Sequence, residues 1–334
     1  MPLRNRICLA TVVACLPYLL LKVAWVAGWG VGVAEEGFDD TTRAANVVTA
    51  ALELVAIAVA VLLVRPAGRR VPAVVVALPA WVATGLLVPV GAGAVLGALL
   101  QGVTGGGNAF AGNDVLAGWV YVVVYVGFAA QAALLLTGFV LHARERWPVV
   151  AHGGSPHHRA GGTSGLQRLL AGVLVAGTTT FAVQQVLWAT VGGGPFTAPT
   201  TPQRVFLAVS AAAALAGAVA TVGLLRGGRL TPARIAATWV GTAVPFSAAF
   251  LETTKNVAID EGWGAPATHP AHAFLTLLVL LAALAGSVGA LLRFADDRPA
   301  TAAPSRAAPP RPTRRGSRPW RGRSAPGGRT TVPR

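Results

Sequence analysis

Residues 7–29, ICLATVVACLPYLLLKVAWVAGW, decide the fold class, because they form an apolar run that contains a single charged residue, Lys22. The hydrocarbon core of a bilayer is about 30 Å thick, and a helix crosses it in about 20 residues at about 1.5 Å each. The run therefore predicts a membrane-spanning helix. The whole chain of 334 residues is 54% hydrophobic and only 12% charged, against about 25% charged in an ordinary soluble domain. This composition excludes a soluble enzyme, a fibrous protein and a disulfide-stapled secreted domain.

Seven more apolar runs of similar length follow along the chain. The eight predicted spans cover residues 7–29, 45–64, 71–100, 115–141, 167–191, 204–225, 233–251 and 270–292. The third run is long and contains Pro79 and Pro89, so we expect a kinked or interrupted helix, or a span followed by a surface segment. The seventh run is short and contains Pro245. The sequence predicts an all-α integral membrane protein with about eight transmembrane helices.

The basic residues between the runs indicate the orientation. Twelve of them lie before the first run or in alternate loops, namely Arg4, Arg6, Arg65, Arg69, Arg70, Arg144, Arg146, Arg159, Arg168, Arg226, Arg229 and Arg234. The other loops carry only Arg43, Arg204 and Lys255. Because the cytoplasmic loops of membrane proteins carry the excess of Lys and Arg, we expect a multi-pass protein with both termini in the cytoplasm.

Two segments lack apolar runs and divide the chain. Residues 152–165, HGGSPHHRAGGTSG, predict a flexible cytoplasmic linker between a first four-helix half, 1–151, and a second one, 166–293. Residues 294–334 are rich in Pro and Arg with little aliphatic content, which predicts a disordered cytoplasmic tail. From Arg293 onward, eleven arginines stand against two aspartates, a net charge of +9 out of +15 for the chain. The basic excess therefore indicates a charged tail, and we expect no nucleic-acid partner.

The two predicted halves share a few residues at similar offsets. Tyr18, Lys22 and Trp25 align with Phe181, Gln185 and Trp188, and Trp81, Val82 and Thr84 align with Trp239, Val240 and Thr242. This pattern favours a 4+4 duplication with parallel halves, since four spans return the chain to its starting side. The alternative is that the tryptophans are interfacial anchors of unrelated helices.

Charged residues inside a span are costly, so they are the first candidates for a functional site. Lys22 and Glu53 lie well inside the first and second runs, at similar predicted depths. They predict an intramembrane ion pair, which is either a proton or substrate site or a structural pair; Lys22 alternatively extends to the outer headgroups. Polar intramembrane candidates are Gln131, Gln184 and Gln185, which hydrogen-bond between helices in the usual case.

Other polar groups give weaker indications. His269 and His272 form HPAH at the start of the eighth run and are weak metal candidates, because no third ligand stands at a fixed spacing. Residues in the tail predicted to contact anionic lipid headgroups are Arg314, Arg315, Arg318, Arg321 and Arg323. We expect no cofactor, and the bilayer itself as the partner.

Two stretches carry a family resemblance. LPYLLLKVAWVAG, residues 16–28, and AWVATGLLVP, residues 80–89, resemble a group of uncharacterised multi-spanning membrane proteins of actinomycete-type bacteria. The resemblance implies a bacterial plasma membrane and no particular activity.

The sequence favours a transporter-like or channel-like protein, because the duplication and the Lys22–Glu53 pair are both features of such proteins. One alternative is a non-catalytic membrane scaffold or sensor that acts through its cytoplasmic tail. The other is a membrane-embedded enzyme, which is least favoured because the sequence contains no nucleophile, metal or phosphate constellation.

Overall fold

The computed structural model describes residues 3–33, 40–65, 67–105, 115–153, 162–196, 198–258 and 270–296, all within one compact unit, Met1–Asp297. The tail predicted for residues 294–334 lies outside the described residues apart from its first three, and most of the predicted linker lies outside them as well.

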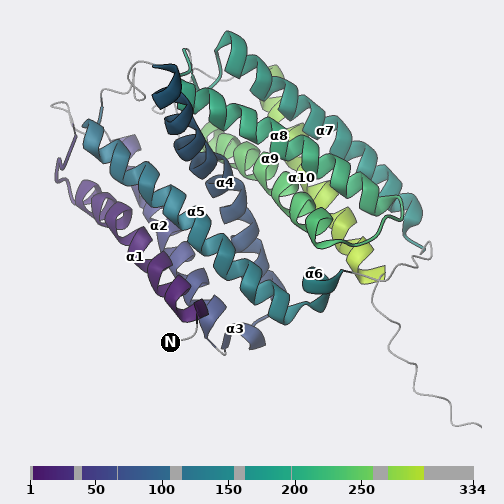
Figure 1. The fold of residues 1–334 in the computed structure, drawn as a ribbon. Coiled ribbons are helices and arrows are strands. Elements are labelled where there is room, and N and C mark those ends of the chain that lie inside the picture. The colour runs from purple at the N-terminus through teal and green to yellow at the C-terminus, as the bar shows by residue number, and fades with distance from the viewer. Residues whose placement is uncertain are drawn as a thin grey trace, which may run out of the picture. The chain divides into compact units, whose positions relative to one another are not determined.

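Eight long helices form this part of the chain (Figure 1). They are α1 (Leu3–Val26), α2 (Asp40–Val64), α4 (Ala73–Thr104), α5 (Gly118–Arg146), α7 (Ser164–Val191), α8 (Thr201–Leu225), α9 (Pro232–Ala258) and α10 (Pro270–Asp296). Two short helices, α3 (Ala67–Arg70) and α6 (Pro148–His152), lie between them in the chain. The eight long helices are all long and apolar enough to cross a membrane, which confirms the predicted all-α class and the count of eight.

The prolines of the third and seventh runs do not interrupt the helices. The third run forms a single continuous helix, α4, which contains Pro79 and Pro89. The predictions of an interrupted helix and of a span followed by a surface segment are therefore wrong. A proline removes one backbone donor, and a neighbouring helix compensates for this in an apolar bundle. The helix ends at Gly105, which has a left-handed backbone with φ of 70°. The seventh run, α9, is 27 residues long despite Pro245 and exceeds its predicted length.

The helices pack as two sets of four that share one contact region. In the first set, α1 packs on α2 and α5, and α5 packs on α4. In the second set, α7 packs on α8 and α10, and α9 packs on both α8 and α10. Helix α4 contacts α8 and α9 and so joins the two sets, as Figure 1 shows.

Small residues allow the closest helix approaches. A Cβ added at Gly85 of α4 would meet the Ala243 carbonyl and the Ser247 hydroxyl of α9. Gly217 of α8 and Gly241 of α9 face each other, and a Cβ on either would meet the Cα of the other. Glycines in such positions bring two helix backbones into direct contact.

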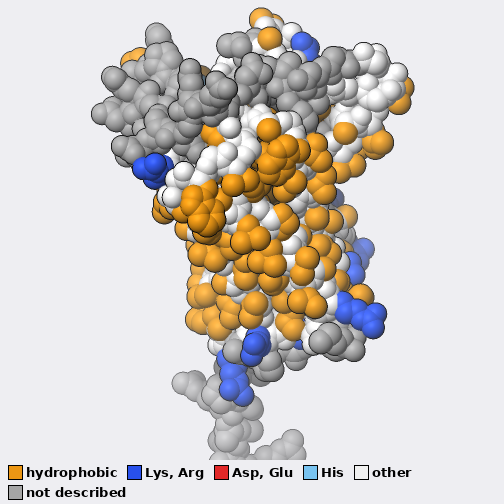
Figure 2. Space-filling view, turned by 90° about the vertical axis from the view of Figure 1, so that its left-hand side faces the viewer, with side chains coloured by type: hydrophobic (Ala, Val, Ile, Leu, Met, Phe, Trp, Pro, Cys, Tyr) orange, Lys and Arg blue, Asp and Glu red, His pale blue; other side chains and the backbone are white. Residues whose placement is uncertain are grey.

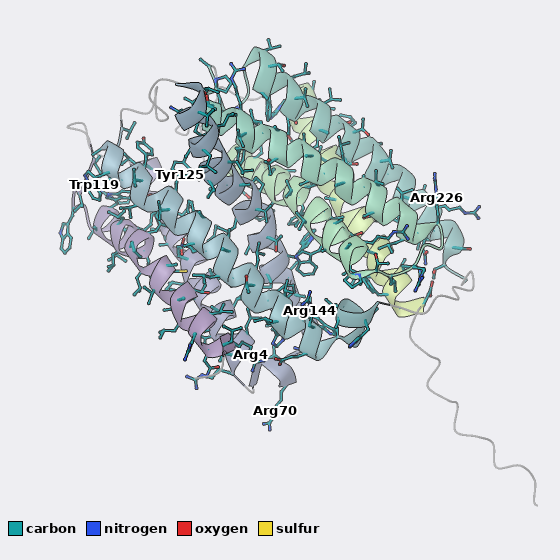
Figure 3. All side chains as sticks on the ribbon, viewed as in Figure 1. Arg4, Arg70, Trp119, Tyr125, Arg144 and Arg226 are labelled. Carbon is teal, nitrogen blue, oxygen red and sulfur yellow. The ribbon has the colours of Figure 1, made fainter. Side chains whose placement is uncertain are left out.

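Arginines mark one end of the helices, which we call the basic end. Arg4, Arg70, Arg144 and Arg226 lie there, whereas Trp119 and Tyr125 lie toward the other end of α5 (Figure 3). Between the two ends the surface is apolar, and Figure 2 shows one face of this hydrophobic band. Its exposed residues include Leu20, Val126, Leu169, Val219 and Leu291.

Candidate functional site

The polar side chains of α1 lie on one face of the helix. Thr11, Cys15, Tyr18, Lys22 and Trp25 are spaced alternately by four and three residues, which places them in one stripe. All five are buried. The main partners of α1 are α2 and α5, so this stripe lies in the seam between the three helices.

Helix α2 carries a matching set of polar residues, Asn46, Thr49 and Glu53, in the opposite chain direction. The Lys22 ammonium donates a hydrogen bond of 2.7 Å to Asn46 Oδ1. Tyr18 lies one turn from Lys22 on α1 and interacts with Thr49, and Cys15 lies one turn beyond Tyr18 and interacts with the Glu53 carboxyl. We call these three pairs the polar ladder; its residues are Cys15, Tyr18 and Lys22 on α1 and Asn46, Thr49 and Glu53 on α2.

Helix α5 adds a third side to the ladder at Glu53. Gln131 is 2% exposed, and its Nε2 donates to Glu53 Oε1 at 3.3 Å and to the Ala14 carbonyl at 3.4 Å. A buried carboxyl is tolerated only where hydrogen bonds replace its hydration. Gln131 was predicted as a polar candidate without a partner, and the structure brings it to the predicted acid.

Aromatic rings surround the charge at the other end of the ladder. The Lys22 ammonium lies 4.7 Å from the Tyr18 ring centroid and 4.9 Å from that of Trp25. Such cation–π contacts stabilise a desolvated ammonium by about 2 kcal/mol. The Trp25 indole donates in turn to the Val31 carbonyl at 2.9 Å, which fixes the ring.

Lys22 and Glu53 are both buried, at 7% and 4% exposure, as expected for residues inside the spans. Their closest hydrogen-bond partners are neutral, since Lys22 bonds Asn46 and Glu53 contacts Gln131 and Cys15. The two charges also interact through space. Direct ion pairing between them stays a prediction.

Two polar atoms of the ladder have unused hydrogen-bonding capacity. Within the described ranges, Glu53 Oε2 and Asn46 Nδ2 are buried and have no hydrogen-bond partner. Buried polar atoms are satisfied in most folded proteins, so an unpartnered pair in one seam calls for an explanation. Glu53 Oε2 is available to accept a proton or a hydrogen bond, and Asn46 Nδ2 is available to donate a hydrogen bond to a small polar ligand.

A small cavity continues the seam toward the basic end. It has a volume of ≈ 10 Å³, and Arg4, Cys8 and Thr11 of α1 are among its lining residues, with Leu63 and Leu135 opposite. About 10–15 Å³ is the minimum that holds one water molecule. Beyond it, Arg4 forms an ion pair of 2.6 Å with Glu145 of α5. Neither Glu145 nor Cys8 had been recognised as a candidate from the sequence.

The predicted candidates of the second set form a separate group. Gln184 of α7 lies 3.4 Å from His272 Nδ1, and His272 Nε2 lies 3.7 Å from Glu252 of α9. Gln185 is 5% exposed on the same helix. His269 lies outside the described residues, and within those residues no three His, Cys, Asp or Glu side chains are close enough to hold a metal ion.

An open groove of ≈ 400 Å³ between α7 and α10 lies beside this group, lined by residues that include Gln184, Trp188 and Leu275.

Two buried residues near the basic end are not among the candidates predicted from the sequence. His142 is 1% exposed with Nδ1 at 3.3 Å from the Leu63 carbonyl. Arg293 is 0% exposed and its Nη2 donates to the Gly228 carbonyl at 3.4 Å. Both lie in the last turns of their helices. Basic residues are common at exposed helix ends, so the sequence alone does not indicate that these two are buried.

Comparisons of the chain with protein families, with curated proteins and with solved structures found no match. The resemblance to actinomycete membrane proteins therefore stays a prediction, as does the lipid contact of Arg314, Arg315, Arg318, Arg321 and Arg323, which lie outside the described residues.

Proposed function

We propose that the protein is a plasma-membrane protein that crosses the bilayer eight times and moves a small solute or ion across it. The eight long apolar helices and the exposed hydrophobic band support the membrane placement. The observation that carries a transport function is the polar ladder, since a Lys and a Glu are costly to keep in a span and mark substrate or ion pathways.

The distribution of arginines supports the proposed orientation. Arg4, Arg70, Arg144 and Arg226 gather at the basic end (Figure 3), and the cytoplasmic side of a membrane protein carries the excess of basic residues. With an even number of spans, both termini lie at that end. The described start of α1 and end of α10 accordingly reach the cytoplasm.

Reciprocal hydrogen bonds at the contact between the sets support the duplication. Trp81 Nε1 of α4 donates to Thr242 Oγ1 of α9 at 3.2 Å, and Trp239 Nε1 of α9 donates to Thr84 Oγ1 of α4 at 3.0 Å. Trp81 and Trp239, like Thr84 and Thr242, are the residues that the two repeats align. A two-fold axis between the halves of one chain would exchange residue pairs in this way. Among the described residues, the contact of α4 with α8 has no counterpart of similar extent between α9 and α2.

The burial pattern supports the same alignment. The repeats equate α1 with α7, α2 with α8, α4 with α9 and α5 with α10, and each set has the same order of neighbours. Three buried positions of α1 then fall on buried positions of α7: Cys15 on Thr178, Tyr18 on Phe181 and Lys22 on Gln185. Helix α8 contains no acidic residue that would correspond to Glu53. The duplication thus places the polar ladder in the first half alone.

The test uses the purified full-length protein in vesicles and a panel of small ions and organic solutes. We expect uptake of at least one of them, and its loss in the folded variants Lys22→Ala and Glu53→Ala. If the single variants only lower the folded yield and the double variant recovers it, the pair is structural and transport through this site is refuted. Tail deletion that abolishes capture of a cytoplasmic protein while no solute moves would favour the scaffold function instead.

A further inference from the structure

We propose that the polar ladder binds and conducts protons, with the Glu53 carboxyl as the proton-binding group. The inference rests on the proposed transport function and names its substrate. Three features of the α1, α2 and α5 seam support it: the spacing of its polar groups, the unpartnered oxygen of Glu53 and the burial of these side chains.

The spacing of the ladder suits stepwise proton transfer. From the Lys22 end to Glu53, each turn of α1 offers a side chain that holds or passes a proton, first an ammonium, then the Tyr18 hydroxyl and then the Cys15 thiol. Each contacts a polar side chain of α2 at the same level. The Thr49 hydroxyl, which also donates to the Ala45 carbonyl at 2.9 Å, completes the middle pair.

The proton-binding atom is Glu53 Oε2. Oε1 already accepts from Gln131, whereas Oε2 is buried and has no partner in the described ranges. A proton that arrives through the ladder forms an O–H bond on the carboxylate and gives a neutral carboxylic acid; its release restores the carboxylate. Nothing else is formed or consumed in this step.

The charges that surround Glu53 come from few sources. Helix α1 supplies Lys22 and the ionisable groups of Cys15 and Tyr18, and α5 supplies Tyr125, which interacts with Tyr18. Helix α4, residues 73–104, contains no ionisable side chain. Lys22 is the buried cation of the ladder, and it balances the Glu53 carboxylate while the proton is absent. Arg43 lies one turn before Asn46 on α2 and is exposed.

The burial of the ladder favours the proton over a larger substrate, since Cys15, Tyr18 and Lys22 are all buried. The cavities described above lie elsewhere: one is at the basic end of the seam, and the other is a groove on α7 and α10. A proton needs no cavity of its own. The hydrogen bonds of the ladder run across the seam to α2, and successive levels are one helix turn apart. The ≈ 10 Å³ space beside Thr11 and Cys8 accommodates about one water, which continues the path toward Arg4 and Glu145.

The experiment measures proton uptake into vesicles of phosphatidylcholine and phosphatidylglycerol that contain the full-length protein and a trapped pH-sensitive dye, under an imposed potassium diffusion potential. We expect Glu53→Gln, which keeps the shape of the side chain but binds no proton, to slow the uptake by about a hundredfold, as removal of a positioned proton-transfer group does. The matched control is Glu252→Gln, the same change on α9 outside the ladder, which should leave the rate unchanged.

Folded protein is verified for each variant by its elution as a single species and by its unfolding temperature. Unchanged proton uptake in folded Glu53→Gln refutes the proton path. If the protein moves a solute of the panel but no protons, the transport function stands and the present inference fails; if neither moves, both fail.

Discussion

The two sets of helices have a similar arrangement but differ in the side chains buried between their helices. At three buried positions that the proposed duplication equates, α1 has Cys15, Tyr18 and Lys22, and α7 has Thr178, Phe181 and Gln185. Helix α2 carries Glu53, whereas α8 contains no acidic residue. The second set is closely packed without a single charge at these positions. A four-helix set of this arrangement therefore does not need the ladder in order to fold, and this makes a functional explanation of Lys22 and Glu53 stronger than a structural one.

The largest expected effect comes from giving the first set the side chains of the second. The double variant Lys22→Gln and Glu53→Ala carries glutamine, as α7 does at Gln185, and removes from α2 the buried acid that α8 lacks. We expect it to fold and to lose about a hundredfold in proton uptake, since the proton-binding group is gone. Uptake at the parental rate in this variant would show that the difference between the sets is not functional.

The second effect concerns the contact that joins the sets. In Gly85→Leu the new side chain meets the Ala243 carbonyl and Ser247 of α9, and overpacking of this kind costs about 1–3 kcal/mol of the free energy of unfolding. The control is Gly172→Leu on α7, where an added Cβ has open space. Denaturant titration of both in detergent compares them, and equal stability would contradict the close approach of α4 and α9.

The third prediction tests the proposed two-fold relation between α4 and α9. Trp81→Phe and Trp239→Phe each remove one of the reciprocal hydrogen bonds to Thr242 and Thr84. We expect each to lower the free energy of unfolding by about 1 kcal/mol, with similar values for the two. A large loss in one variant and none in the other would break the equivalence of α4 and α9.

The smallest effect is at the basic end. Glu145 is half exposed in its ion pair with Arg4, and exposed ion pairs contribute about 0–1 kcal/mol. Glu145→Gln should therefore change the unfolding temperature little and respond weakly to salt. A marked destabilisation would mean that this pair, rather than the helix seam beside it, holds the start of α1 in place.

Most of the fold follows from the sequence, because long apolar runs are a strong signal. Eight helices were predicted at the right places, and α4 was the main ambiguity, since Pro79 and Pro89 bend or break a helix according to what surrounds them. The contact of α4 with α8 and α9 could not be predicted, because hydropathy gives no information on which apolar faces meet.

The site was predictable only in part. Lys22 and Glu53 were found because a charge stands out in an apolar run, and Gln131 was found for the same reason. Cys15, Tyr18 and Thr49 are ordinary residues of apolar helices, and only their alternating spacing of three and four residues, shared with the charges, indicates that they face the same seam. Their partners depend on the rotation of each helix about its axis, which the sequence does not determine.

The central claim is that Glu53 binds a proton in the ladder, and infrared difference spectroscopy of the full-length protein tests it most directly. On acidification in vesicles, we expect a carboxylic acid band that shifts in heavy water, is absent from Glu53→Gln and persists in Glu252→Gln. A band that is the same in all three proteins, or no change of the Glu53 carboxyl between alkaline and acidic pH, would contradict the claim.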